Sequence, residues 1–264
     1  MTGRRIVLAS LSSAMDGGFT AVSDVSQAMA AAGASAEYRL IGGMTVMLHV
    51  QRLGLDLPLR GTADADFVVP RHVLRQPDLV EAIEALGYAK TFGNRWERPV
   101  DGRGVAAVDL LVPAYTSRAR DTVKVGDVVT TEVPGLAVAF RRPGLTVQAE
   151  LHMTDGVIVT TDIVLPDAIG TLALKAGARS VRNESRDAED LWRCLEVAAA
   201  DGVTPEMFDA DTALEELRAD LWRELGPNGH SLASLTGDLQ GDAAARRRTR
   251  VRALLAETIG TAPS

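Results

Sequence analysis

The chain has 264 residues, 46% hydrophobic and 24% charged, which is ordinary for a globular protein and sufficient for one large domain or two smaller ones. Its formal net charge of −7 argues against general coating of nucleic acid, although it does not exclude a local basic groove. The apolar run over residues 6–11 is too short for the core of a signal peptide, and no later segment is long enough to span a bilayer. We therefore expect a cytoplasmic protein without membrane association.

Helices and strands alternate in the first part of the chain. Gly33 and Gly87 follow helical patterns as stop signals, and Asp101-Gly102 and Asp155-Gly156 are typical of hairpin turns. In chain order, the sequence predicts a helix over 19–33, a strand over 38–41, a helix over 45–53, a strand over 63–69, a helix over 78–86, an antiparallel pair over 88–100 and 105–112, and strands over 128–133 and 146–164.

Helical patterns dominate from residue 166 onward. Pro166-Asp167 opens the first helix, with Asp167 as its expected cap. The predicted helices cover 166–181, 183–200, 204–225 and 242–258, with a loop rich in Gly, Pro, Asn and Ser over 226–241. We therefore predict an α/β domain over residues 1–164 and a helical domain over residues 165–264.

Three aspartates lie in the predicted strands of the first domain. Asp64 and Asp66 alternate along one strand and therefore point the same way, and Asp109 interrupts another apolar strand. Solvated acids on an edge strand, or a nearby arginine partner for Asp109, are the alternatives. Because buried carboxylates each need a partner, three on neighbouring strands favour a bound metal. One cysteine and four scattered histidines give no zinc-type spacing, so the expected ion is Mg²⁺ or Mn²⁺.

Two glycines, Gly42 and Gly43, stand between the strand over 38–41 and the helix that follows it. Glycine lets a backbone approach phosphate closely, and the start of a helix attracts anions. On their own the two glycines indicate only a tight turn. Together with the acids downstream they predict a phosphate site.

Four cations, Lys175, Arg179, Arg182 and Arg186, are spaced to form one stripe if the helix continues past Asn183. Such a stripe would hold a triphosphate. A solvated charged face is the alternative for Arg179 and Arg182, whereas the apolar neighbours of Lys175 indicate a partly buried side chain.

Two further charged groups follow the stripe. Asp187 and Asp190 would position Lys or Arg side chains or contact substrate, or else pair within their helix with Arg186 or Arg193. The run of five arginines over 246–252 would either contact an RNA backbone or form a solvated helix face, and the second interpretation is the commoner one.

Four segments carry a resemblance to a known family: GGMT (42–45), RGTADADFVV (60–69), VDLLVP (108–113) and LKAGARSVRNESRDAEDLW (174–192). Over residues 37–200 the chain resembles the AbiEii-type nucleotidyltransferases of bacterial toxin–antitoxin systems. The resemblance implies an α+β fold, with a mixed sheet flanked by helices and a helical C-terminal domain. It also implies a two-metal reaction that transfers a nucleotide from an NTP to an acceptor hydroxyl. The expected acceptor is the 3′ end of tRNA or another RNA, and the expected partner is a cognate antitoxin.

The resemblance also implies roles for individual residues. Asp64, Asp66 and Asp109 would ligate Mg²⁺ (or Mn²⁺), and Lys175 and Asp190 would complete the catalytic set. The nucleotide-binding residues would be Gly42, Gly43, Thr45, Lys175, Arg179 and Arg186. Met44 stands where the family usually has a hydroxyl, which here comes one place later, at Thr45.

Two other functions fit the same residues. One is a nucleotidyltransferase that modifies a small molecule or a protein, and the other is a non-catalytic nucleotide-binding relative.

Overall fold

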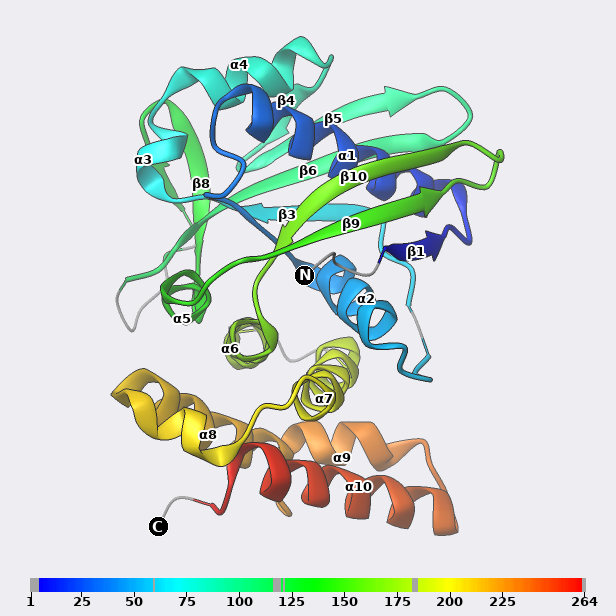
Figure 1. Cartoon of the computed structure of the whole chain (residues 1–264), viewed down its shortest axis with the longest axis vertical. Coiled ribbons are helices and arrows are strands. Elements are labelled where there is room, and N and C mark those ends of the chain that lie inside the picture. Colours follow the sequence, from blue (N-terminus) through cyan, green and yellow to red (C-terminus); the bar gives the residue numbers. More distant parts are fainter. Residues whose placement is uncertain (1–4, 59, 116–119, 121, 182–184, 263–264) are drawn as a thin grey trace. The chain divides into compact units, whose positions relative to one another are not determined.

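The computed structural model describes residues 5–58, 60–115, 120, 122–181 and 185–262, and it divides into two compact units, residues 1–167 and 168–264 (Figure 1). The strands of the first unit are β1 (Ile6–Ala9), β2 (Arg39–Ile41), β3 (Asp64–Val68), β4 (Ala89–Phe92), β5 (Arg95–Val100), β6 (Gly104–Pro113), β7 (Val123–Val125), β8 (Val128–Val133), β9 (Leu145–His152) and β10 (Ile158–Leu165). Its helices are α1 (Ser13–Ala31), α2 (Gly42–Leu53), α3 (Arg71–Leu74), α4 (Pro77–Ala85) and α5 (Leu136–Arg141).

A mixed seven-stranded sheet forms the centre of the first unit. Its order is β2-β3-β6-β5-β4, with β8 beside the end of β6 and β7 beside β8. The pairs β3–β6 and β6–β8 are parallel, and β2–β3, β4–β5, β5–β6 and β7–β8 are antiparallel. A second sheet has the order β1-β9-β10.

Helix α1 packs closely on the central sheet. Its N-cap is Ser12, whose hydroxyl accepts a hydrogen bond from the Met15 N–H group. The helix contacts β3, β6 and β10, and its side chains Phe19, Val22 and Met29 are fully buried. A Cβ atom on Gly17 would lie 2.2 Å from the carbonyl oxygen of Val105 in β6, so only glycine lets the helix approach the sheet this closely.

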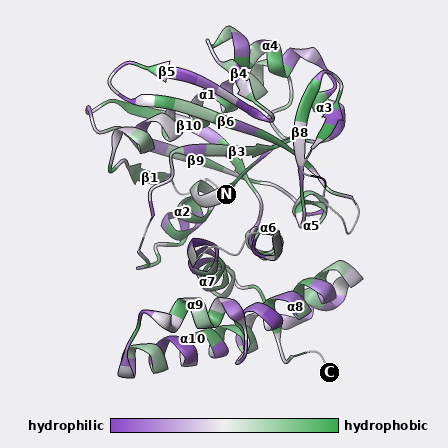
Figure 2. Ribbon diagram, turned by 180° about the vertical axis from the view of Figure 1, so that it is seen from behind, coloured by the Kyte–Doolittle hydropathy of each residue, from purple (hydrophilic) through white to green (hydrophobic). Residues whose placement is uncertain are grey.

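The secondary-structure elements among the described residues of the second unit are all helices. It contains α6 (Ala168–Val181), α7 (Ser185–Ala200), the 3₁₀ helix η1 (Pro205–Ala210), α8 (Thr212–Leu225), α9 (His230–Gly237) and α10 (Gly241–Ile259). Helix α7 contacts α6, α9 and α10. Figure 2 shows hydrophilic and hydrophobic stretches alternating along α8 and α10, as expected of helices that bury one face only. None of the described helices combines the length and apolar character needed to cross a membrane.

The predicted fold class, α+β with a mixed sheet, flanking helices and a helical C-terminal region, is confirmed. Several predicted bounds were wrong. Helix α1 begins six residues earlier than expected because Ser12 caps it. The segment predicted as one strand over 88–100 is two strands, since Gly93 adopts a positive φ of 52° between β4 and β5. The predicted loop over 226–241 contains helix α9.

We predict that Gly17→Ala lowers the free energy of unfolding by about 1–3 kcal/mol, because the new methyl group meets a backbone carbonyl that cannot rotate away. Urea unfolding followed by circular dichroism measures this. Gly237→Ala is the matched control, because nothing lies within 4 Å of its Cβ position at the end of α9. Equal stability of the two variants would contradict the close packing of α1 on β6.

Candidate functional site

The three predicted acids lie together on one face of the central sheet. Asp66 of β3 is paired in register with Asp109 of β6, and Asp64 lies two residues before Asp66 on the same face. Neighbouring strands are about 5 Å apart, so the carboxylates of Asp66 and Asp109 are neighbours. The parallel register of β3 and β6 therefore creates an acidic cluster, which we define as Asp64, Asp66 and Asp109.

Arg95 of β5 provides the positive charge that holds this cluster together. It is paired in register with Asp109 and donates from Nη1 to that carboxylate at 2.9 Å and from Nη2 to Asp64 at 2.7 Å. Its Nε donates to Glu97 at 2.7 Å. The Asn94 side chain adds a hydrogen bond of 3.1 Å to Asp109. One guanidinium group thus bridges three carboxylates from three strands.

The pKa of Asp109 shows how crowded the acids are. Burial and the neighbouring charge of Asp66 raise it to about 6, although Arg95 acts in the opposite direction. For Arg95, burial lowers the pKa, but the hydrogen bonds to Glu97 and Asp64 and the nearby carboxylate charges outweigh this effect and raise it. Arg95 therefore stays charged, and Asp109 takes up a proton at mildly acidic pH.

The two glycines begin α2 directly after β2, beside the acidic cluster. Gly42 has a φ of 77°, and a Cβ atom there would lie 2.2 Å from an Asp66 carboxylate oxygen. The N-cap of α2 is Ile41, which has no side-chain acceptor for the first N–H groups of the helix. A Cβ atom on Gly43 would lie 3.2 Å from the Arg60 guanidinium. The turn therefore combines a partly exposed backbone without Cβ atoms, helix N–H groups and a nearby cation, which suit an anion.

The acidic cluster matches the donor preference of a hard divalent cation, because it offers several carboxylate oxygens and the repulsion between Asp66 and Asp109 would be relieved by a cation. In the part of the chain that the structure describes, however, no group of three or more His, Cys, Asp or Glu side chains is arranged to hold a metal ion. Arg95 bridges Asp64 and Asp109 instead. Metal binding therefore stays a prediction.

The hydroxyl of Thr45 is directed at the protein backbone. It donates a hydrogen bond of 2.6 Å to the carbonyl of Leu40, and the residue is buried. This bond ties the first turn of α2 to β2. The predicted contact between Thr45 and nucleotide stays a prediction, and it requires a change of side-chain rotamer.

In the second unit, Lys175 and Asp190 form a buried ion pair between α6 and α7. Lys175 Nζ donates to Asp190 at 2.8 Å, and Arg193 Nη1 donates to the other carboxylate oxygen at 3.0 Å. Cys194 is fully buried beside these charges, and burial raises the pKa of its thiol to about 12. The observed partners of Asp190 are Lys175 on α6 and Arg193 on its own helix, so it both positions a lysine and pairs within its helix. Contact between Asp190 and substrate stays a prediction.

The remaining predicted cations have different surroundings. Arg179 is buried, and its Nε donates to Ser231 at 2.9 Å and to Glu224 at 3.3 Å. Arg186 is exposed near the start of α7. Arg182 lies outside the described residues. The roles of Lys175, Arg179, Arg186 and Asp190 with nucleotide therefore remain predictions.

The sequence analysis missed three residues near the site, namely Asn94 and Arg95 at the acidic cluster and Arg60 at the glycine turn. Only part of the signal for Arg95 was present in the sequence, because the Asp101-Gly102 turn predicts the hairpin, whereas the pairing of residue 95 with residue 109 depends on a three-residue loop over 101–103. Nothing in the sequence indicates Arg60, because it comes from the segment between α2 and β3, outside the helices and strands.

Comparison with known proteins gives limited results. No protein-family model matches the chain, and no curated protein matches it. Among solved structures, the chain is similar to an antigenic nucleotidyltransferase-like protein from Paracoccidioides brasiliensis, with 16% identity, a TM-score of 0.46, and coverage of 93% of this chain and 95% of that chain. A likeness at this level does not assign a family or an activity.

We predict that Arg95→Met raises the pKa of Asp109 from about 6 by about one unit or more, because burial and the charge of Asp66 then act without the opposing cation. Titration of the Asp109 carboxyl ¹³C signal by NMR measures this. Arg98→Met is the control, because Arg98 lies on the same strand but pairs with Asp24. An unchanged Asp109 pKa in the Arg95 variant would contradict the bridge.

We also predict that Gly42→Ala displaces the Asp66 carboxylate, whereas Gly33→Ala does not. Both glycines have positive φ angles, 77° and 68°, so both alanine variants carry a similar backbone strain of about 1–2 kcal/mol. Only the Gly42 variant also places a methyl group against Asp66. It should therefore unfold at a lower urea concentration than the Gly33 variant and shift the Asp66 carboxyl ¹³C signal. Identical behaviour of the two variants would be inconsistent with this contact.

Proposed function

We propose that this protein is a nucleotidyltransferase that transfers a nucleoside monophosphate from an NTP to an acceptor hydroxyl. The observation that carries the proposal is the register of β3 and β6, which pairs Asp66 with Asp109 and adds Asp64 on the same face. The glycine turn at the start of α2, which lies against Asp66, supports it. Paired carboxylates beside uncapped helix N–H groups suit the negative charge and the metal of a nucleotide substrate.

In this proposal the acidic cluster holds Mg²⁺ or Mn²⁺, which when bound stabilises the charge on the phosphoryl oxygens. The backbone at Gly42 and Gly43 receives the phosphates, and Thr45, Lys175, Arg179 and Arg186 are the other nucleotide-binding residues. A bond forms between the acceptor oxygen and the α-phosphorus, and the bond to pyrophosphate breaks. Asp109 takes the proton of the attacking hydroxyl. Asp190 acts as a positioning residue through its contact with Lys175.

The expected acceptor is the 3′ end of tRNA or another RNA, and the expected role is that of a toxin with a cognate antitoxin. The support for these finer statements is the resemblance of the segments around Asp64, Asp109 and Lys175 to the AbiEii-type proteins. The same residues would serve a small-molecule or protein acceptor, so the acceptor is decided by experiment.

We predict that the purified protein, with Mg²⁺ or Mn²⁺ and each labelled NTP in turn, transfers label to total RNA. Asp66→Asn and Asp109→Asn should each lower the rate by about 100-fold or more, because each removes a carboxylate that would hold the divalent cation. Asp127→Asn is the control, because its side chain is exposed in the turn between β7 and β8. Unfolding curves establish that the variants are folded.

The outcomes separate the alternatives. Label transferred to a small molecule or a protein but not to RNA would overturn the RNA acceptor and retain the enzyme class. Full activity of the Asp66 variant, or no transfer from any NTP to any acceptor, would overturn the nucleotidyltransferase proposal.

A further inference from the structure

Helix α10 carries a concentration of positive charge in an acidic part of the chain. Residues 168–264 contain 16 acidic and 12 basic side chains, and five of those 12 are arginines between residues 246 and 252. All five lie on α10. Because their surroundings differ, they divide into two groups.

Two of these arginines bind α10 to α7. Arg250 forms an ion pair with Glu196 at 2.5 Å, and the Arg247 guanidinium lies 3.7 Å from the centroid of the Trp192 ring. The Trp192 indole N–H donates to the same Glu196 at 3.2 Å. These contacts hold α10 against α7 and need no ligand.

The other three arginines, Arg246, Arg248 and Arg252, are exposed. Within the described part of the chain none of them has a carboxylate partner, and Arg248 makes only a hydrogen bond of 3.4 Å to the Thr236 hydroxyl. We define these three residues as the α10 arginines.

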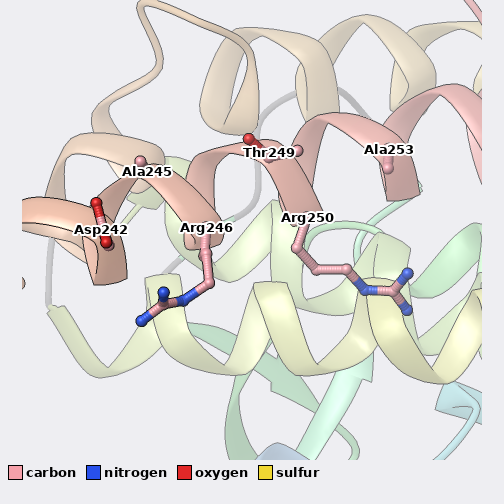
Figure 3. A pocket seen from close by; sticks show the side chains of 6 residues that line it. All are labelled: Asp242, Ala245, Arg246, Thr249, Arg250 and Ala253. Atoms are coloured by element: carbon pink, nitrogen blue, oxygen red, sulfur yellow. The ribbon is translucent and has the colours of Figure 1, made fainter.

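Hollows lie on both sides of the exposed face of α10. The first has a volume of about 470 Å³ and is lined by Asp242, Ala245, Arg246, Thr249, Arg250 and Ala253, and Figure 3 shows Arg246 and Arg250 extending from the same side of the helix. The second, of about 230 Å³, we call the Trp222 pocket. Arg248 and Arg252 line it together with Trp222, Leu232 and Leu255. Thr249 lines both hollows, so together they span the exposed face.

The Trp222 pocket combines two chemistries. The indole N–H of Trp222 donates to the carbonyl of Gly260 at 3.2 Å, which fixes the ring, and Trp222 is only partly buried. Arg248 and Arg252 are one helical turn apart, roughly 6 Å along the axis. A fixed aromatic ring beside two arginines is the arrangement with which proteins bind single-stranded nucleic acid, by stacking a base and contacting its phosphates. An acidic peptide would use the charges but not the ring.

We propose that the exposed face of α10 binds single-stranded RNA, with the α10 arginines on phosphates and an unstacked base in the Trp222 pocket. The choice of RNA over DNA rests on the acceptor proposed above, whereas the surface itself is independent of the acidic cluster. The negative charge of the whole chain limits binding to this face and disfavours general coating.

The test is fluorescence anisotropy with a labelled single-stranded RNA oligonucleotide, measured over a range of salt concentrations without NTP or divalent metal. We expect Arg248→Ala/Arg252→Ala to weaken binding by about tenfold or more at low salt and to reduce the slope of log K against log salt by about 1.4. Arg5→Ala/Arg75→Ala is the control, because it removes the same charge from exposed positions on the first unit. A result in which both double variants bind alike overturns the proposal.

A second measurement isolates the pocket. RNA should quench the tryptophan fluorescence of the wild-type protein, and Trp222→Phe should remove most of that quenching while it keeps a ring in the pocket and an unchanged unfolding midpoint. Quenching that persists in this variant contradicts base binding. Equal competition by polyglutamate would identify a general anion surface, and preferential binding of DNA of the same sequence would identify the wrong nucleic acid. Either result overturns the proposal.

Because no NTP or metal is present, the binding result does not depend on catalysis. Transfer activity that fails while RNA binding persists would overturn only the proposed function. Transfer activity that persists without RNA binding to α10 would overturn only this inference.

Discussion

Three carboxylates on one face of a β-sheet need local neutralisation, and Arg95 meets this requirement in the first unit. The register of β3, β6 and β5 places Asp66, Asp109 and Arg95 on adjacent strands, so the repulsion between the acids and the attraction of the guanidinium are both consequences of the sheet. The raised pKa of Asp109 reflects its burial and the part of the repulsion that Arg95 leaves in place. The packing of α1 on β6 and the tight turn into α2 maintain this register, because each brings a backbone segment against the strands that carry the acids.

The sequence was sufficient to predict that the three acids share one face of the sheet, but not to predict that Arg95 pairs with them. Alternation places Asp64 and Asp66 on one face, and an acid inside an apolar strand marks Asp109, because both follow from the two-residue period of a strand. Arg95 required the register of a hairpin to be carried six residues outward from its turn, which depends on the absence of a bulge in β5 and β6. Arg60 could not be predicted at all, since the conformation of an irregular segment is set by tertiary contacts.

The helical unit shows the same limit in another form. The apolar neighbours of Lys175 in the sequence correctly indicate a buried side chain, but the partner of its ammonium group lies on the next helix. Spacing along one helix likewise cannot separate the arginines of α10 that bind α7 from those that face solvent. Glu196 and Trp192 make that distinction, and they lie about 50 residues away in sequence.

The burial of Cys194 has a practical consequence. A thiol that is fully enclosed and has a pKa of about 12 forms almost no thiolate at neutral pH, and the thiolate is the species that alkylating reagents attack. The wild-type chain should therefore not react with maleimide reagents while it is folded. A single cysteine introduced at an exposed position of α10 would accept a fluorophore or spin label at that position alone, without removal of the native residue.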